Sequence, residues 1–266
     1  MAQKYERHSG NIPQCIKRIV MEKLIEIKDL SFGYEDKPIL EDVDLDLFEQ
    51  DYLLVIGPNG GGKTTLLKII LGIMDPWSGS INFKKDISNK LGYVPQFSSF
   101  NRNFPITVFE MILTGCIDSD NFLKKYKKKE IEKTEKILDR IDLCEKRDEN
   151  INNLSGGQLQ SALIARSLVS DPVVLLLDEP TASIDITSKV NLRDFLKELN
   201  EKMTIVVVTH DPTPFAHAYD HIACLNKNLY YHGRGELDSE ALEKVYGCPV
   251  ELLGHGIPHT MLKEHA

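Results

Sequence analysis

The feature that most constrains this chain is a glycine-rich turn between two apolar segments, in the sequence LLVIGPNGGGKTTLL at residues 53–67. Residues 57–64 fit the pattern G-x-x-x-x-G-K-[ST]. The glycines allow backbone conformations that are closed to other residues, so the N–H groups of the loop can point inward at phosphate oxygens. The helix N-terminus that follows adds free N–H groups and a partial positive charge. The stretch therefore predicts a strand, a phosphate-binding loop and a helix.

Lys63 and Thr64 end this loop with the groups that a bound triphosphate requires. The Lys63 ammonium would reach the β- and γ-phosphates, and the Thr64 hydroxyl would ligate Mg²⁺. The alternative is a glycine-rich turn with a chance lysine, which the strand before it and the helix after it disfavour. The residues of this loop that are expected to bind the nucleotide are Gly57, Pro58, Asn59, Gly60, Gly62, Lys63, Thr64 and Thr65.

A second polar cluster follows the apolar run at residues 173–177. A buried strand that ends in an aspartate matches the element that holds Mg²⁺ in phosphate-loop enzymes, so Asp178 is expected to bind the ion through water. Glu179 is then free to act as the general base that takes a proton from the attacking water. The alternative is two surface acids at the end of a strand.

His210 ends another apolar run, in the sequence VVVTHD. A neutral imidazole there can donate one hydrogen bond to the γ-phosphate and accept another. Taken alone, a histidine in this position is more often structural than catalytic.

Strand and helix patterns alternate along the chain. Alternating apolar and polar residues near the N-terminus indicate half-buried strands, whereas short continuous apolar runs indicate strands buried on both faces. This order predicts an α/β fold with a parallel sheet, in which ligands bind beyond the C-terminal ends of the strands. The continuous runs lie at 53–56, 173–177 and 205–208, and the expected helices lie at 63–71, within 107–144 and at 187–199.

Composition limits the classes of function. The 266 residues carry a net charge of −8, with 32 basic and 40 acidic residues, which argues against a broad nucleic-acid-binding surface. No apolar run approaches the length that spans a bilayer. The five cysteines form no CxxC pair and no export signal is evident, so we expect reduced thiols in a cytosolic protein.

The sequence NLSGGQLQSALIARSL at residues 153–168 contains a serine and two glycines that open a helix, which is a second anion site. Leu154–Gln158 is the complete signature of the ATP-binding cassette (ABC) family, which the chain resembles over roughly residues 24–232. In that family the signature faces the ATP held by a partner cassette. The resemblance therefore implies that two ATP molecules are sandwiched in a twofold, head-to-tail homodimer. The signature residues expected to contact that ATP are Ser155, Gly156, Gly157 and Gln158.

The resemblance assigns roles to three further residues. Tyr34 in FGYEDKPIL would stack on adenine, Gln96 in GYVPQF would contact Mg²⁺ and the attacking water, and Asp185 in ASIDITSK would lie in the loop that touches the partner. Taken singly, each also has a plainer interpretation: a core tyrosine, a loop glutamine and a helix cap. The departures from the family pattern, none of which removes a catalytic atom, are at Gly61, Leu159–Ser161 and Ser183–Ile184.

The fold implied by the resemblance is a P-loop NTPase (RecA-like) α/β core with an antiparallel β subdomain and an inserted α-helical subdomain at about 97–165. The cassette would span 21–235. Residues 1–20 are expected to be a disordered extension or to precede the start that is used, and 236–266 would form a C-terminal tail.

The type of cassette protein follows from what surrounds the motifs. The segment between Gln96 and Leu154 is short and has no long heptad array, which argues against DNA-repair and chromosome-organising ATPases. A single cassette argues against the translation-factor types. There remains the ATPase subunit of a transporter, peripheral on the cytoplasmic face of the membrane, with separate integral-membrane permease subunits.

Two segments resemble the zinc/manganese branch of bacterial importers: the loop at 97–115 and the tail at 225–265. This resemblance implies import of a metal cation and, indirectly, a periplasmic or extracellular metal-binding protein. Phe97–Phe104 would then form part of the groove for a permease helix; the alternative is an exposed aromatic loop without a partner. Rival interpretations are an ABC ATPase for another imported solute and a soluble ABC switch without a membrane partner.

Three other features of the sequence have plainer alternatives. His255 and His259 suggest a metal-binding tail, with Cys248 and His265 nearby. However, Gly256 and Pro258 disfavour a helix that would bring these two histidines to one face, so a flexible or packing tail is favoured. The basic run at 124–130 is read as a solvated helix face rather than a lipid contact. A GTPase is set aside because LNKNL at 225–229 has leucine where the guanine-reading motif needs aspartate.

Overall fold

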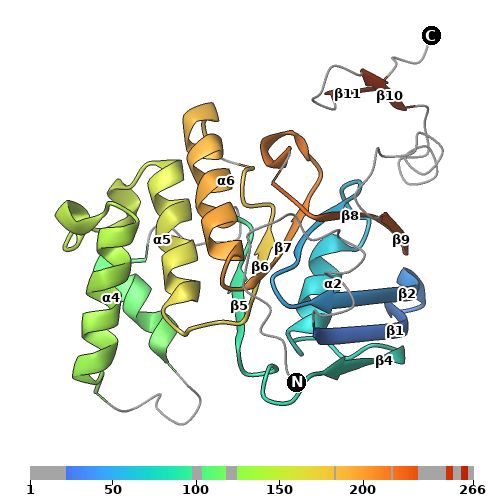
Figure 1. The fold of residues 1–266 in the computed structure, drawn as a ribbon, viewed down its shortest axis with the longest axis horizontal. Coiled ribbons are helices and arrows are strands. Elements are labelled where there is room, and N and C mark those ends of the chain that lie inside the picture. The colour runs from blue at the N-terminus through green and yellow to red at the C-terminus, as the bar shows by residue number, and fades with distance from the viewer. Residues whose placement is uncertain are drawn as a thin grey trace, which may run out of the picture.

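The computed structural model describes residues 22–97, 104–117, 125–182, 184–216 and 218–232, and the backbone of two short strands at 250–253 and 259–262. A six-stranded sheet in the order β5-β6-β7-β3-β8-β9 forms the centre (Figure 1). Its first five members are parallel and the last is antiparallel to its neighbour, so the predicted parallel sheet is confirmed. In spatial order the strands are β5 (Leu91–Val94), β6 (Val174–Asp178), β7 (Thr204–Thr209), β3 (Tyr52–Ile56), β8 (His221–Asn226) and β9 (Asn228–His232).

A second, antiparallel sheet has the order β2-β1-β4. It consists of β1 (Lys23–Tyr34), β2 (Lys37–Phe48) and β4 (Ser78–Phe83). Helix α2 (Lys63–Ile70) packs with this sheet and with one face of the central sheet in a common hydrophobic core. The amide of Glu41 also donates to the carbonyl of Lys227 at 3.0 Å, which ties β2 to the turn between β8 and β9.

The strands of the central sheet are buried on both faces, as their continuous apolar runs indicate. In β3, Leu53 and Val55 point into the core that holds α2 and the antiparallel sheet. Tyr52, Leu54 and Ile56 point into a second core on the opposite face. Because side chains alternate along a strand, one apolar run supplies both cores.

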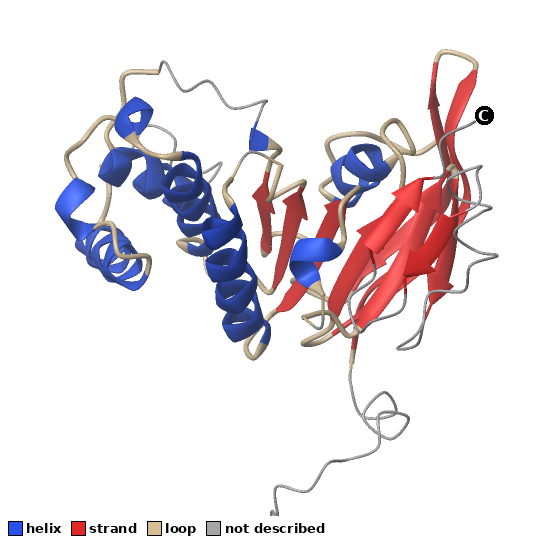
Figure 2. Cartoon of the chain, turned by 90° about the horizontal axis from the view of Figure 1, so that it is seen from above, coloured by secondary structure: helices blue, strands red, loops and turns tan. Residues whose placement is uncertain are grey.

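The second core is covered by helices, which gather on one side of the molecule while most strands lie on the other (Figure 2). Of the helices in the described ranges that cover this core, three lie in the insertion between β5 and β6, and a fourth connects β6 to β7. They are α3 (Val108–Leu113), α4 (Lys128–Arg140), α5 (Gly156–Leu168) and α6 (Ile186–Asn200). Short 3₁₀ helices span Thr114–Cys116, Cys144–Lys146, Ile151–Asn153 and Thr213–Phe215.

Several sequence predictions concern segments at the surface of this fold. Phe97 packs against the second core and Phe104 is 57% exposed, while residues 98–103 lie outside the described part of the chain. In the basic run, residues 125–129 (four lysines and Tyr126) are exposed around the start of α4, in keeping with a solvated face. LNKNL forms the tight turn from β8 to β9, with Lys227 at φ 62°.

In the tail, β10 (Val250–Leu253) and β11 (His259–Leu262) pair as an antiparallel hairpin. His259 begins β11, and Cys248, His255 and His265 lie outside the described residues. Within the described ranges, no helix combines the length and the apolar character needed to cross a membrane.

Candidate nucleotide-binding and hydrolysis site

The glycine-rich loop joins the C-terminal end of β3 to the N-terminus of α2. Gly62 is the N-cap of α2 at φ 94°, a left-handed conformation that favours glycine. At Gly57 the need is for space, because a Cβ there would lie 2.0 Å from the carbonyl oxygen of Leu225 in the neighbouring strand β8. The loop is therefore folded tightly against the sheet. Residues 63–65, in the first turn of α2, line the pocket that the loop forms.

A pocket of about 450 Å³ opens above this loop, a volume within the usual range for small-molecule sites. Tyr34 and Ile39 come from the antiparallel sheet, and Gln96 and Glu179 follow strands of the central sheet. The structure thus brings together residues that the sequence places in four separate motifs. The pocket is lined by Tyr34, Ile39, Asn59, Gly60, Gly62, Lys63, Thr64, Thr65, Gln96 and Glu179.

Lys63 lies buried beneath the loop, with a side chain that is 6% exposed. Its ammonium donates hydrogen bonds to the carbonyl oxygens of Gly57 at 2.9 Å and Pro58 at 3.0 Å. It also lies 3.5 Å from Oε1 of Glu179. A single cation therefore bridges the phosphate-binding loop and the predicted general base.

Glu179 is held in one orientation by groups at the C-terminal end of β7 and directly after it. Its backbone is left-handed at φ 48°, and its amide donates to the carbonyl oxygen of Val208 at 2.9 Å. The hydroxyl of Thr209 donates to Oε2 at 3.0 Å, and Nδ1 of His210 lies 2.9 Å from the same oxygen. Strained backbone of this kind persists where surrounding contacts enforce it, often at functional sites. Thr209 was not predicted from the sequence, although a hydroxyl at the end of a strand beside His210 was a usable signal.

Asp178 lies at the end of β6 and is 1% exposed. Its carboxylate accepts hydrogen bonds from the Thr64 hydroxyl at 3.1 Å and the Tyr93 hydroxyl at 3.4 Å. Burial raises the pKa of Asp178 above its ordinary value, and the bond from Thr64 opposes this shift. Tyr93 was not predicted from the sequence, because its partner lies 85 residues away.

The paired oxygens of Thr64 and Asp178 fit Mg²⁺, a hard cation that takes oxygen ligands and uses few protein groups beside substrate phosphates. Within the described ranges no cluster of three or more His, Cys, Asp or Glu residues suited to a metal is found.

Replacing Asp178 by asparagine should stabilise the protein when ATP and magnesium are left out. The pKa of Asp178 is higher in the folded state than in the unfolded chain, so the folded protein keeps this proton to higher pH. As pH rises from the unfolded pKa through the folded pKa, ionisation of Asp178 therefore lowers the stability of the folded state. Asp178→Asn should raise Tm by about 2–4 °C at neutral pH, with a smaller difference near about pH 4. Thermal unfolding at the two pH values measures this, and a lower Tm at neutral pH would contradict it.

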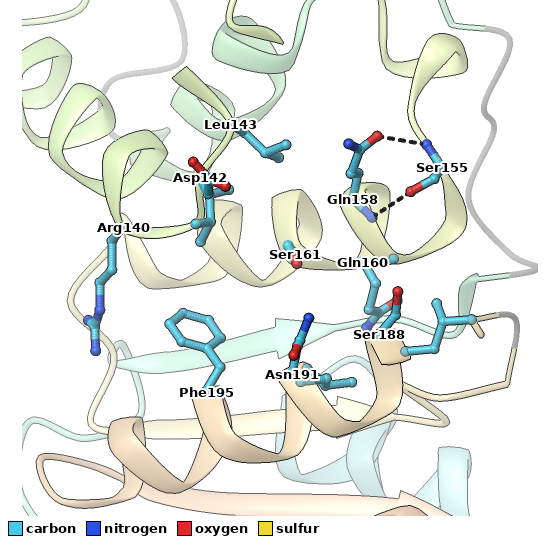
Figure 3. Close-up of a pocket in the computed structure, with 14 residues that line it drawn as sticks. Arg140, Asp142, Leu143, Ser155, Gln158, Gln160, Ser161, Ser188, Asn191 and Phe195 are labelled. Atoms are coloured by element: carbon cyan, nitrogen blue, oxygen red, sulfur yellow. Dashed lines mark hydrogen bonds between the residues drawn. The ribbon is translucent and has the colours of Figure 1, made fainter. Parts of the chain in front are cut away.

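The signature segment starts helix α5. Ser155 is the N-cap, and its hydroxyl accepts a hydrogen bond from the backbone N–H of Gln158 at 3.3 Å (Figure 3). In return, the side-chain carbonyl of Gln158 accepts from the backbone N–H of Ser155 at 3.0 Å. Ser155, Gly157 and Gln158 line a second hollow, beside α6, and none of them lines the pocket of the phosphate loop. Within one chain, therefore, the two predicted anion sites face different pockets.

Asp185 is the N-cap of α6, accepting from the Ser188 amide at 3.0 Å and the Ser188 hydroxyl at 2.7 Å. Ser188 in turn lies against the signature, because a Cβ on Gly157 would be 2.3 Å from its hydroxyl oxygen. The structure thus links Asp185 to the signature through one side chain, while contact with a partner remains a prediction.

The fold and the phosphate pocket define a phosphate-loop nucleoside triphosphatase. The profile of the ABC transporter family matches residues 40–182. The chain is 36% identical over 211 residues to the high-affinity zinc uptake system ATP-binding protein ZnuC of Bacillus subtilis, covering 77% of this chain and 91% of that protein. It is 36% identical over 230 residues to the manganese transport system ATP-binding protein MntB of Listeria monocytogenes, covering 84% and 96%.

Among solved structures, an inward-facing transporter described as of the metal-chelate ABC type superposes with a TM-score of 0.77 at 31% identity, covering 86% of this chain and 91% of the matched one. The chain belongs to the ABC transporter family. It has the P-loop NTPase fold that was predicted, and it binds and hydrolyses ATP.

Proposed function

We propose that this protein powers the import of a divalent metal cation, zinc or manganese, through a separate permease at the cytoplasmic face of the membrane. The names of the two curated relatives, a zinc and a manganese system, support this choice of solute. Residues 21–235 would form the cassette, with the helical insertion at about 97–165 and the tail at 236–266. Phe104, exposed at the start of that insertion, supports a surface that a permease helix covers.

The hydrolytic step is assigned to residues around the phosphate pocket. Glu179 takes the proton of the attacking water, and Thr209 and His210 hold its carboxylate in position. The γ-phosphate competes with Glu179 for Lys63, so binding of ATP would release the base from its ion pair. His210, on the exposed side of Glu179, would then donate to the γ-phosphate.

Magnesium would be held by Thr64 and Asp178, with Gln96 at the rim of the same pocket. When bound there, Mg²⁺ offsets the negative charge that develops on the phosphoryl oxygens. Tyr34 would stack on adenine, because it is half exposed and lines the same pocket.

The observation that carries the proposed ATP-driven mechanism is the separation of the signature from the phosphate-binding loop. The signature and the phosphate loop line different pockets, so one chain cannot apply both to one nucleotide. Two copies arranged head to tail place each signature on the other's ATP. The closed dimer then binds ATP better than the open one, and that difference in affinity drives the permease between its conformations.

Uptake of radioactive zinc and manganese tests the proposal in cells that express this chain with a candidate permease. We expect the wild-type chain to support accumulation of one of the two metals and Glu179→Gln to reduce it to background. If neither metal depends on Glu179 while purified protein still hydrolyses ATP, the solute assignment fails and another imported solute is indicated.

Purification of the tagged chain from detergent-solubilised membranes separates a transporter subunit from a switch without a membrane partner. We expect a multi-spanning protein to co-purify at a stoichiometry close to one per cassette. Recovery of the chain only from the soluble fraction, without such a protein, would favour the soluble ABC switch.

A further inference from the structure

We propose that Trp77 is a positioning residue for nucleotide binding: it supports Phe32, and Phe32 holds the Tyr34 ring in the orientation that receives adenine. The inference rests on the proposed stacking role of Tyr34 and adds a residue outside the pocket to base recognition. Trp77 is the single tryptophan of the chain and does not line the nucleotide pocket.

Tyr34 is held by two neighbours that do not line the nucleotide pocket, Phe32 and Met74. Its ring meets the Phe32 ring edge to face, with centroids 5.2 Å apart and an interplanar angle of 85°. Its hydroxyl donates to Sδ of Met74 at 3.6 Å. Tyr34 remains 48% exposed, so these contacts fix the ring while leaving a face accessible.

Trp77 stands behind this pair. Its ring lies 6.1 Å from the Phe32 ring, at an angle of 36°. The indole also covers the backbone between the two aromatics, because a Cβ on Gly33 would lie 2.3 Å from Cη2 of Trp77. Its amide donates to the carbonyl oxygen of Ser31 at 2.8 Å, which attaches the residue to β1 directly before Phe32.

These contacts make a continuous series from Trp77 through Phe32 to Tyr34. Trp77 is 51% exposed and belongs to neither hydrophobic core, so its burial contributes less to folding than that of a core aromatic residue. Aromatic pairs prefer defined geometries, and a ring that is held in its binding orientation loses less entropy when a ligand arrives. The structure therefore gives Trp77 a role in pre-orienting the adenine platform.

The test compares ATP with inorganic tripolyphosphate, which has the phosphates but no base. For the full-length protein, Trp77→Ala should weaken ATP binding by about three- to tenfold, the range expected for loss of an aromatic pair. Binding of tripolyphosphate and kcat at saturating ATP should stay within about twofold of wild type, because the phosphate loop and Glu179 are untouched. Trp77→Phe should restore most of the ATP affinity.

A double-mutant cycle shows whether Trp77 acts through Tyr34. Because both changes affect one interaction, Tyr34→Ala with Trp77→Ala should weaken ATP binding little more than Tyr34→Ala alone. If Tyr34→Ala leaves ATP affinity unchanged, the adenine role of Tyr34 is wrong. If Tyr34→Ala weakens ATP binding but Trp77→Ala does not, or if Trp77→Ala weakens ATP and tripolyphosphate equally, the positioning role is overturned.

The wild-type protein offers a measurement that needs no variant to fold. Because Trp77 is the only tryptophan, its emission reports directly on the aromatic series. Saturating ATP should change that emission, whereas saturating tripolyphosphate should leave it close to the unliganded value. Equal responses to the two ligands would contradict coupling between the base and Trp77.

Discussion

Glu179→Gln should hydrolyse ATP at least about 100-fold more slowly than wild type, the lower range for removal of a general base. It should bind ATP at least as tightly, because it removes the carboxylate that competes with the γ-phosphate for Lys63. The substitution keeps the shape of the side chain, and an amide oxygen can still accept from Thr209. It removes the ability to take a proton from water. Single-turnover hydrolysis with radiolabelled ATP, beside ATP affinity measured by calorimetry, separates chemistry from binding.

The same variant should accumulate as a dimer on size-exclusion chromatography with ATP and magnesium, because closure occurs and hydrolysis no longer reopens the dimer. The matched control is Glu145→Gln, which removes an exposed carboxylate outside the phosphate pocket and should leave rate and mass unchanged. Hydrolysis by Glu179→Gln at the wild-type rate would show that another group is the base.

Ser155→Asp should prevent the ATP-dependent dimer of Glu179→Gln without weakening ATP binding to the single chain. Aspartate is as good an N-cap as serine, so α5 should form normally. In the head-to-tail dimer its carboxylate would face the γ-phosphate of the partner's ATP, and two like charges in a closed interface are costly. We expect the ATP-dependent dimer to weaken by at least about tenfold, a loss of about 1.4 kcal/mol.

Ser155→Asn is the control that isolates charge, since asparagine has nearly the shape of aspartate and also caps helices. In the Glu179→Gln background it should retain much more of the dimer than Ser155→Asp does. Equilibrium sedimentation across a range of protein concentrations measures both. Equal dimerisation of the two variants would mean that the signature does not face a phosphate across the interface.

The parts of the site that the sequence predicted well are local in the chain. The phosphate-binding loop lies within eight consecutive residues, and its glycine conformations and the start of α2 follow from those residues. Ser155 and Asp185 likewise cap helices by hydrogen bonds to residues three positions later. For Asp185 the structure shows the plainer alternative, a helix cap, while its contact with a partner stays a prediction.

The contacts that the sequence did not predict join residues far apart in the chain. Glu179 meets Thr209 only because β6 and β7 are neighbours, and Asp178 meets Tyr93 only because β6 lies beside β5. No residue pattern states the order of strands in a sheet, since any apolar run can pair with any other of similar length. The series from Trp77 to Tyr34 depends in the same way on the pairing of β1 with β4.

The sequence by itself determined the chemistry: a phosphate-binding loop, carboxylates at strand ends and a serine-glycine turn that opens a helix, each specified by neighbouring residues. Only the tertiary structure decided which of these groups lie in the same pocket. The loop, Asp178, Glu179 and His210 lie together at one edge of the sheet, whereas the signature lines a different pocket. The physical reason is that short-range hydrogen bonds follow chain order, whereas packing of strands and helices sets which motifs meet.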